Sequence, residues 1–294
     1  MPEHRITRRG FLAGGAAALA AAATPAWAQR RSATDLVPLG HSGVRVTRLA
    51  FGTGTFGGRV QRELGQERFT RLVRYAYERG IRFFETADSY RGMPQMLAEA
   101  RRGLPRDSYQ LMTKMRWRDE TNPGATLDRF RKDLNTDYFD ILLMHCVRTP
   151  AWREELKPLQ EALSEAKHRQ VLRAHGASCH GLLPLRAFPG HSWLDVALLR
   201  INHDGTRMDT LQSESNEKGD VAQVTQTIAR LHEQGTGVLG MKLAGEGQFT
   251  QPEQRDAALR YVMKLGTVDA VTIGFKSEAE IDEAIERINQ HLNA

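Results

Sequence analysis

Short apolar runs alternate with longer amphipathic stretches along most of this chain. Runs of four to eight apolar residues predict buried strands, and apolar residues that recur every three or four positions predict helices. Eight strand-then-helix units follow one another in this way. The predicted strands cover residues 49–56, 82–85, 109–114, 138–145, 173–178, 195–201, 237–243 and 269–273. The predicted helices cover residues 66–79, 93–102, 125–134, 157–169, 182–188, 221–234, 254–265 and 278–289.

The eight units predict an α/β fold in which parallel strands close into a (β/α)8 TIM barrel. Strands that alternate with helices pair in parallel, and a closed barrel of this kind takes about 250 residues. A doubly wound open sheet is the alternative, but it usually has fewer units and a glycine-rich first turn. Residues 51–58 contain glycines without the helix that should follow them, a weak match to that fingerprint. Residues 37–40 and 44–48 predict a β-hairpin ahead of the barrel.

The first 28 residues have the three parts of a twin-arginine export signal. Arg8 and Arg9 lie in a Thr-Arg-Arg-Gly-Phe-Leu motif, an Ala/Gly stretch covers residues 13–23, and an Ala-x-Ala cleavage site ends at Ala28. An alanine-rich disordered tail is the alternative. We therefore expect export of the folded protein to the periplasm by the twin-arginine machinery, a linker at residues 29–34 and a barrel at 35–294. The apolar stretch is too short and too weakly hydrophobic for a stable membrane span.

Composition excludes some classes of partner. The chain has 294 residues, 40% of them hydrophobic, and a formal net charge of +6, of which +2 lies in the first 28 residues. The remaining surplus is small, and no basic run is interleaved with aromatic residues, so we expect no nucleic-acid partner. The two cysteines, Cys146 and Cys179, end neighbouring strands; a disulfide is conceivable in an oxidising compartment, with free thiols as the default. No zinc-ligand spacing is present, so no metal is expected.

Three polar side chains follow successive predicted strands. Tyr90, Lys114 and His145 lie at or just past the C-terminal ends of strands two, three and four. These ends meet at one mouth of a barrel, where the active sites of such folds lie. A phenol, an ammonium and an imidazole there predict a proton-transfer site. We expect Lys114 to lower the pKa of Tyr90 from about 10 and Glu85 to hold Lys114; if the reaction is a carbonyl reduction, we expect His145 to hydrogen-bond the carbonyl oxygen.

Four segments, in order, carry a resemblance to a known family. They read Gly-Ile-Arg-Phe-Phe-Glu-Thr-Ala-Asp-Ser-Tyr at 80–90, Leu-Met-Thr-Lys at 111–114, Tyr-Phe-Asp-Ile-Leu-Leu-Met-His at 138–145 and Gly-Ala-Ser-Cys-His at 176–180. Over residues 35–290 the chain resembles the aldo-keto reductases. The resemblance implies a barrel whose base is plugged by the hairpin, and NADPH-dependent reduction of aldehydes or ketones. It makes Tyr90 the general acid beside Lys114 and His145, with Glu85 where the family has Asp.

The same resemblance predicts cofactor contacts and several departures from them. The family's Ser-Asn pair corresponds to Ser178-Cys179, its Gln on strand six to Leu198, and its stacking aromatic to Met241. Lys276 would meet the 2′-phosphate, but Glu280 in the following helix would repel it. NADPH and NADH both stay open as cofactors. The predicted cofactor-binding residues are Gly52, Thr53, Gly54, Ser178, Cys179, Met241, Lys242, Leu243, Lys276 and Ser277.

The resulting prediction is an exported NAD(P)H-dependent oxidoreductase that reduces a small aldehyde or ketone. Two alternatives stay open. One is an exported barrel that binds a ligand or cofactor with little turnover, which the altered cofactor contacts would favour. The other is a cofactor-independent isomerase or lyase that uses Tyr90 and Lys114 for enolisation. The periplasm holds little free nicotinamide cofactor, so an exported reductase would have to carry or recycle its own.

Overall fold

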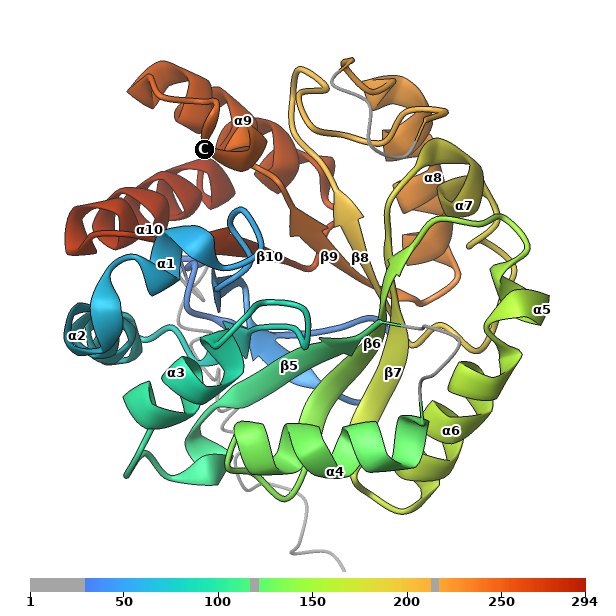
Figure 1. The fold of residues 1–294 in the computed structure, drawn as a ribbon. Coiled ribbons are helices and arrows are strands. Elements are labelled where there is room, and N and C mark those ends of the chain that lie inside the picture. The colour runs from blue at the N-terminus through green and yellow to red at the C-terminus, as the bar shows by residue number, and fades with distance from the viewer. Residues whose placement is uncertain (1–29, 117–121, 213–216) are drawn as a thin grey trace, which may run out of the picture. The chain divides into compact units, whose positions relative to one another are not determined.

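Eight parallel strands close into a barrel that is surrounded by helices (Figure 1). The protein is described by a computed structural model, which covers residues 30–116, 122–212 and 217–294. The predicted export signal lies outside these described residues. The predicted (β/α)8 barrel is confirmed, and β10 closes it by pairing with β3. Its strands are β3 (Leu49–Gly52), β4 (Phe83–Glu85), β5 (Gln110–Met115), β6 (Phe139–Val147), β7 (Leu172–Cys179), β8 (Val196–Arg200), β9 (Gly237–Met241) and β10 (Ala270–Gly274).

Helices connect the strands on the outside of the barrel. Several begin at a side-chain cap: Asn122, Asp220 and Ser277 each accept a hydrogen bond from the backbone three residues on. Two four-residue helices, α1 (Arg59–Arg62) and α5 (Trp152–Glu155), were not predicted, because one turn is too short to show a period.

None of the described helices is long and apolar enough to cross a bilayer. The helices are α1 (Arg59–Arg62), α2 (Gly65–Glu78), α3 (Met93–Ala100), α4 (Pro123–Asp133), α5 (Trp152–Glu155), α6 (Lys157–His168), α7 (Leu182–Arg186), α8 (Val221–Glu233), α9 (Pro252–Leu265) and α10 (Glu278–Leu292), with 3-10 turns η1 (Arg106–Ser108) and η2 (Gly245–Gly247).

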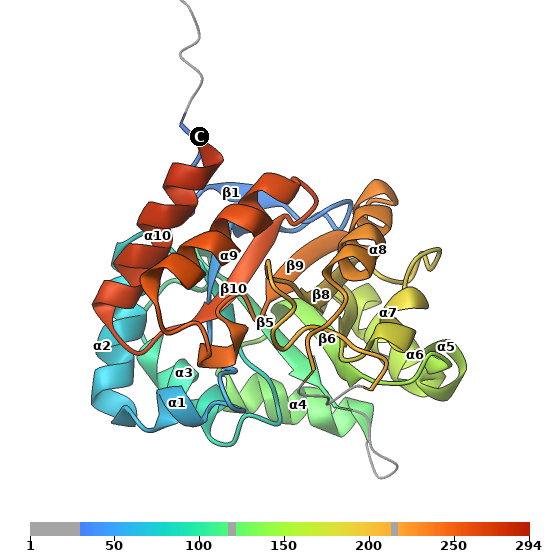
Figure 2. The ribbon, with the colours of Figure 1, turned by 90° about the horizontal axis from the view of Figure 1, so that it is seen from above.

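The predicted N-terminal hairpin closes the base of the barrel. Strands β1 (Leu36–Pro38) and β2 (Arg45–Thr47) pair antiparallel, and Figure 2 shows β1 on the side of the barrel where α10 ends. Leu39 and Val46 are fully buried in the same cluster as the inward-facing strand residues. Gly40 has φ +46, and a Cβ there would lie 2.2 Å from the Gly235 carbonyl oxygen just before β9. Only glycine therefore allows this close approach.

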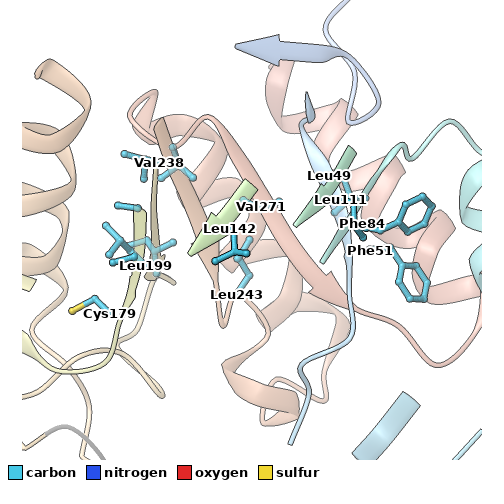
Figure 3. Close-up of a cluster of buried hydrophobic side chains, with 14 of the residues drawn as sticks. Leu49, Phe51, Phe84, Leu111, Leu142, Cys179, Leu199, Val238, Leu243 and Val271 are labelled. Carbon is cyan, nitrogen blue, oxygen red and sulfur yellow. The ribbon is translucent and has the colours of Figure 1, made fainter. Parts of the chain in front are cut away.

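Alternation along the strands separates an inner layer of side chains from an outer one. The outer layer, which includes Phe51, Phe84 and Leu199, packs against the helices (Figure 3). The inner layer includes Phe83 on β4, Met112 on β5 and Leu143 on β6. Because the side-chain period of a strand is two, the next inward-facing residues on these strands are Glu85, Lys114 and His145. The apolar packing that holds the barrel closed thus also aims these three polar side chains at its mouth.

The segment ahead of the hairpin is attached to the last helix. The Arg31 backbone N–H donates to Asn293 Oδ1 at 2.9 Å, and the Ala33 N–H donates to Asn289 Oδ1 at 2.7 Å. Ala33 is fully buried in the core cluster. Residues 31–33, which we predicted as part of a linker, therefore pack on α10 in this structure.

Candidate active site

Glu85 and Lys114 form a buried ion pair at the C-terminal ends of adjacent strands. Lys114 Nζ donates to Glu85 Oε1 and also to the Thr86 carbonyl oxygen, at 2.7 Å. The two side chains are 4% and 2% exposed, respectively. The expected pair is thus present despite the longer side chain of glutamate. Thr272 on β10 donates to the other carboxylate oxygen at 3.4 Å.

The loop after β4 continues to pair with β5 and so places Tyr90. The Thr86 N–H donates to the Met112 carbonyl at 3.0 Å, and the Asp88 N–H donates to the Lys114 carbonyl at 3.1 Å. The loop then turns, which brings the Tyr90 ring over Lys114, with Nζ 4.9 Å from the ring centroid. Tyr90 also meets His145 edge to face, at 5.6 Å between ring centroids. The three predicted side chains therefore gather at one mouth.

The protonation of Tyr90 differs from our expectation. Burial raises the pKa of Tyr90 well above its usual value of 10, and Cys146, Glu246 and Asp88 reinforce that shift. Burial also holds the pKa of Lys114 well below its usual value, with a contribution from the charge of Lys242. The expected lowering of the Tyr90 pKa by Lys114 is therefore wrong here, because desolvation of the phenolate is the larger effect. Tyr90 stays a neutral phenol that can donate its proton.

A β-bulge positions His145. The register of β6 against β7 shifts between Met144 and Val147, and Cys146 has φ 62. The Cys146 N–H is held by Ser178 Oγ at 2.8 Å. Bulges of this kind re-aim side chains next to active sites. His145 Nδ1 lies 3.2 Å from Ser89 Oγ and 3.7 Å from Asp88 Oδ1. Burial lowers the pKa of His145 to about 4, although the carboxylate of Asp88 opposes that shift.

His145 should make the stability of the protein depend on pH. In the unfolded chain its pKa is about 6.5, so the unfolded state takes up this proton first as the pH falls. The free energy of unfolding should be highest above pH 6.5 and decrease as the pH falls toward about 4. We expect His145 to account for a loss of about 2 kcal/mol between pH 7 and pH 5. Over the same pH range, the free energy of unfolding of a His145→Gln protein, measured by urea denaturation, should decrease less than that of the wild-type protein by this amount. Equal decreases in the two proteins would contradict the lowered pKa of His145.

A cavity of about 530 Å³ runs from this site to the N-terminus of α10. Gly52 and Gly54 form part of its wall and leave room for the catalytic candidates. A Cβ at Gly52 would lie 3.1 Å from Glu85 Oε2, and one at Gly54 would lie 2.6 Å from the Tyr90 hydroxyl oxygen. The lining includes six predicted cofactor residues: Gly52, Gly54, Met241, Lys242, Leu243 and Lys276. It also includes Leu198, Thr55, Phe56, Phe249, Arg255, Thr272, Gly274, Glu280 and Glu283.

Four other predicted cofactor residues have different surroundings and are not among the described residues that line this cavity. Thr53 Oγ1 donates to the Glu85 carbonyl oxygen at 3.0 Å, which holds β3 to the end of β4. Ser178 holds the bulge through Cys146, and Ser277 caps α10 by accepting from the Glu280 N–H at 3.3 Å. Cys179 is buried in the outer core cluster. These contacts orient the walls of the site.

The end of the cavity near α10 carries paired charges. Glu280 Oε2 accepts from the Lys276 backbone N–H at 2.8 Å, and its other oxygen lies 3.9 Å from Lys276 Nζ. Arg255 donates to both oxygens of Glu283 at 2.9 Å. Each carboxylate at this end thus already has a cationic partner. An anionic ligand group here would meet Lys276 and Glu280 together.

Sequence reasoning missed several residues of the cavity. Thr272 follows the inward-facing Ala270 by two positions, so strand alternation could have identified it. Glu246 lies in the loop after β9, binds Lys242, and lies 3.7 Å from Arg207 in the loop after β8. A contact between two loops leaves no local pattern in a sequence. Arg255 on α9 is equally distant in the chain from the strands that form the site.

The two cysteines are free thiols. Cys146 accepts a hydrogen bond from Arg148 Nε at 3.3 Å, and Cys179 donates to the Gly181 carbonyl at 3.4 Å. Burial raises the pKa of Cys179 well above its usual value. Cys179 therefore stays a neutral thiol, and the default expectation of free thiols agrees with this structure.

Comparison with known proteins identifies the family. A model of the Aldo/keto reductase family matches residues 48–256. The chain is 24% identical to L-galactose dehydrogenase of Arabidopsis thaliana in a match that covers 87% of this chain and 88% of that protein. It is 29% identical to "Probable aldo-keto reductase 1" of Glycine max in a match that covers 47% of each protein. The fold is similar to that of an aldo-keto reductase from Bacillus halodurans in its holo form, with a TM-score of 0.68, 18% identity and coverage of 88% and 95%. The chain belongs to the aldo/keto reductase family.

Proposed function

We propose that the protein is an NAD(P)H-dependent oxidoreductase that reduces an aldehyde or ketone to an alcohol, with Tyr90 as the general acid. One observation carries the proposal: Tyr90 and Glu85 line a 530 Å³ cavity, and the Tyr90 ring contacts Lys114 and His145, which are not among the described residues that line it. Membership of the family supports the reaction class. The neutral state of Tyr90 suits a group that gives up a proton during reduction.

The cavity brings together residues that would hold the two ends of a dinucleotide. Gly54, Leu198 and Met241 would hold the nicotinamide next to Tyr90. Lys276 and the capped N-terminus of α10 would receive a phosphate or ribose at the other end. The volume is typical of sites for small organic ligands. When bound, the cofactor supplies the hydride for the carbonyl carbon.

The chain's own residues then handle the proton. A carbonyl oxygen in the cavity beside the Tyr90 hydroxyl would take its proton, which leaves a phenolate. The Lys114 ammonium lies over the Tyr90 ring and would stabilise that negative charge. Glu85 and the Thr86 carbonyl hold Lys114 in this place. Preorganised charge of this kind, shielded from water, is usually the largest contribution to catalysis.

Binding and turnover separate this proposal from the alternatives. Purified mature protein is titrated with NADPH and NADH by fluorescence, and cofactor oxidation is then followed with a generic aldehyde. L-galactose with NAD⁺ belongs in the substrate panel because of the similarity to a dehydrogenase of that sugar. Binding without turnover would favour a ligand-binding protein, and activity that needs no cofactor would favour an isomerase or lyase. Either result would reject the reductase proposal.

We also propose that the protein is exported in its folded state through the twin-arginine pathway. The motif around Arg8 and Arg9 and the Ala-x-Ala site before Gln29 support this. Folded export would let the cofactor be bound in the cytoplasm. Replacing both arginines by lysine should retain the protein, with its signal uncleaved, in the cytoplasm of a bacterial host. Periplasmic accumulation of that variant, measured by cell fractionation, would reject the proposal.

Glu280 should weaken the binding of NADPH relative to NADH. Its carboxylate shares Lys276 with any phosphate that approaches the N-terminus of α10. Removing the charge with Glu280→Gln should improve the NADPH-to-NADH affinity ratio about fivefold, as expected for about 1 kcal/mol of partly screened repulsion. Glu286→Gln, an exposed position on the same helix, makes the same change in net charge and serves as the control. An equal ratio in all three proteins would place the 2′-phosphate away from Glu280.

A further inference from the structure

Asp88 lies between His145 and a second cavity. Its Oδ1 is 3.7 Å from His145 Nδ1, and its Oδ2 accepts from the Arg116 backbone N–H at 3.3 Å. Its side chain also lines a cavity of about 150 Å³, whose polar lining residues include Thr113, Arg129 and Asp133. The Asp88 side chain is thus close enough to act on the imidazole.

The second cavity leaves room for water beside the Asp88 side chain. Asp88 Oδ1 is buried and makes no hydrogen bond to the residues that the structure describes. A polar cavity needs about 10–15 Å³ to hold a water molecule, so 150 Å³ has room for several. Water there could hydrogen-bond the carboxylate, whose side chain is only 13% exposed.

The contact with the Asp88 side chain favours one tautomer of the imidazole. His145 is neutral near pH 7, so one ring nitrogen carries a proton and the other carries a lone pair. A carboxylate only accepts hydrogen bonds, so Asp88 favours the proton on Nδ1. A separation of 3.7 Å without a ligand is compatible with this, because such contacts tighten when substrate binds. Ser89 Oγ, 3.2 Å from the same nitrogen, competes, because a hydroxyl can donate as well as accept.

The other charged groups around His145 do not select a tautomer. Lys114 on β5 and Arg116 at the end of β5 both disfavour the imidazolium, and Asp88 favours it. Tyr90 meets the ring edge to face, and Cys146 follows it on β6. Among these groups, Asp88 is the anion that lies nearest to Nδ1.

We propose that Asp88 is a positioning residue that holds the proton of His145 on Nδ1, which leaves Nε2 as an unprotonated acceptor in the catalytic site. The proposal rests on the proposed function. It means that His145 accepts a hydrogen bond from a hydroxyl, either that of Tyr90 or that of the alcohol product. A carbonyl oxygen only accepts hydrogen bonds, so Nε2 would not bond it, and this role departs from the carbonyl contact that we expected for His145 from the sequence. The proton that forms the new O–H bond then leaves Tyr90 Oη, and His145 gives none up.

Nitrogen-15 NMR of the imidazoles tests the proposal on the full chain without ligand. The His145 signals are identified by their absence from His145→Gln protein. At pH 7 we expect Nδ1 to give a protonated, pyrrole-type signal and Nε2 a pyridine-type signal. Asp88→Asn should abolish this preference, because an amide NH2 can donate to Nδ1 and move the proton to Nε2. A wild-type His145 with its proton on Nε2, or an unchanged tautomer in Asp88→Asn, would overturn the proposal.

Two further variants make the test specific. Asp133→Asn alters the second cavity without facing His145, so its tautomer should match wild type. Ser89→Ala removes the competing hydroxyl and should keep the proton on Nδ1. If Asp88→Asn does not fold, the His145 tautomer of this variant serves as a second NMR test. In turnover, we expect Asp88→Asn to lower kcat about 10- to 100-fold with little change in KM. An equal effect of Asp133→Asn on kcat would contradict the role of Asp88.

The NMR result and the proposed function can fail separately. If His145 carries its proton on Nδ1 but the wild-type protein reduces no carbonyl, the reductase proposal fails and the Asp88–His145 relation stands. If the protein reduces aldehydes while His145 carries its proton on Nε2, the reductase proposal stands and the role of Asp88 is rejected.

Discussion

Replacing Tyr90 with phenylalanine should lower kcat for carbonyl reduction about 1000-fold and leave cofactor affinity nearly unchanged. The substitution removes a single oxygen, the one that a Cβ at Gly54 would crowd at 2.6 Å. A positioned general acid contributes about 10²- to 10⁴-fold to a rate. The ring remains in place over Lys114, so the cavity keeps its shape. Stopped-flow measurement of cofactor oxidation under saturating substrate would give the change in rate.

A matched substitution elsewhere separates chemistry from stability. Tyr75 on α2 donates to Asp282 Oδ2 at 2.7 Å, away from the cavity. Tyr75→Phe removes the same oxygen and should cost at most about 1.5 kcal/mol of stability with no change in kcat. If Tyr90→Phe retained more than about a tenth of the wild-type rate, the proton would have to come from another group, and Tyr90 would lose its assigned role.

The strand pattern was enough to predict the positions of three polar site residues. Glu85, Lys114 and His145 each follow an inward-facing apolar residue by two positions, and a closed barrel makes such positions converge. Tyr90 lies in a loop beyond the strand, so strand periodicity does not fix its direction; it was predicted from its place just past a strand end and from the family motif. The loop adopts its course because its backbone continues to pair with β5.

The electrostatic state of the site could not be read from the sequence. The motif suggested that Lys114 lowers the pKa of Tyr90, whereas the balance between burial and charge depends on distances in three dimensions. The contact between Asp88 and His145 joins residues 57 positions apart across two strands and a bulge. Likewise, Ser178 and Ser277 were assigned to the cofactor by motif, but in the structure they support a bulge and cap a helix.

Removing either partner of the Glu85–Lys114 pair should strongly destabilise the protein, and removing both should cost less than the sum. When one partner is removed, the other charge stays buried without compensation, and this destabilises a protein by about 3–5 kcal/mol. We expect Lys114→Met and Glu85→Gln each to lower the free energy of unfolding by this amount. The double variant should recover about 2–3 kcal/mol relative to the sum of the single variants. Urea denaturation of the four proteins measures this coupling.

An exposed ion pair provides the reference for this cycle. Arg71 and Glu67 pair on the surface of α2 with side chains 58% and 89% exposed, and their coupling should be about 0.5 kcal/mol or less. Additive effects at Glu85 and Lys114 would mean that the two charges interact weakly and that water reaches the pair. The double variant also separates stability from catalysis. If it folds stably but does not reduce carbonyls, the buried pair is needed for the reaction, in which we propose that Lys114 stabilises the phenolate of Tyr90.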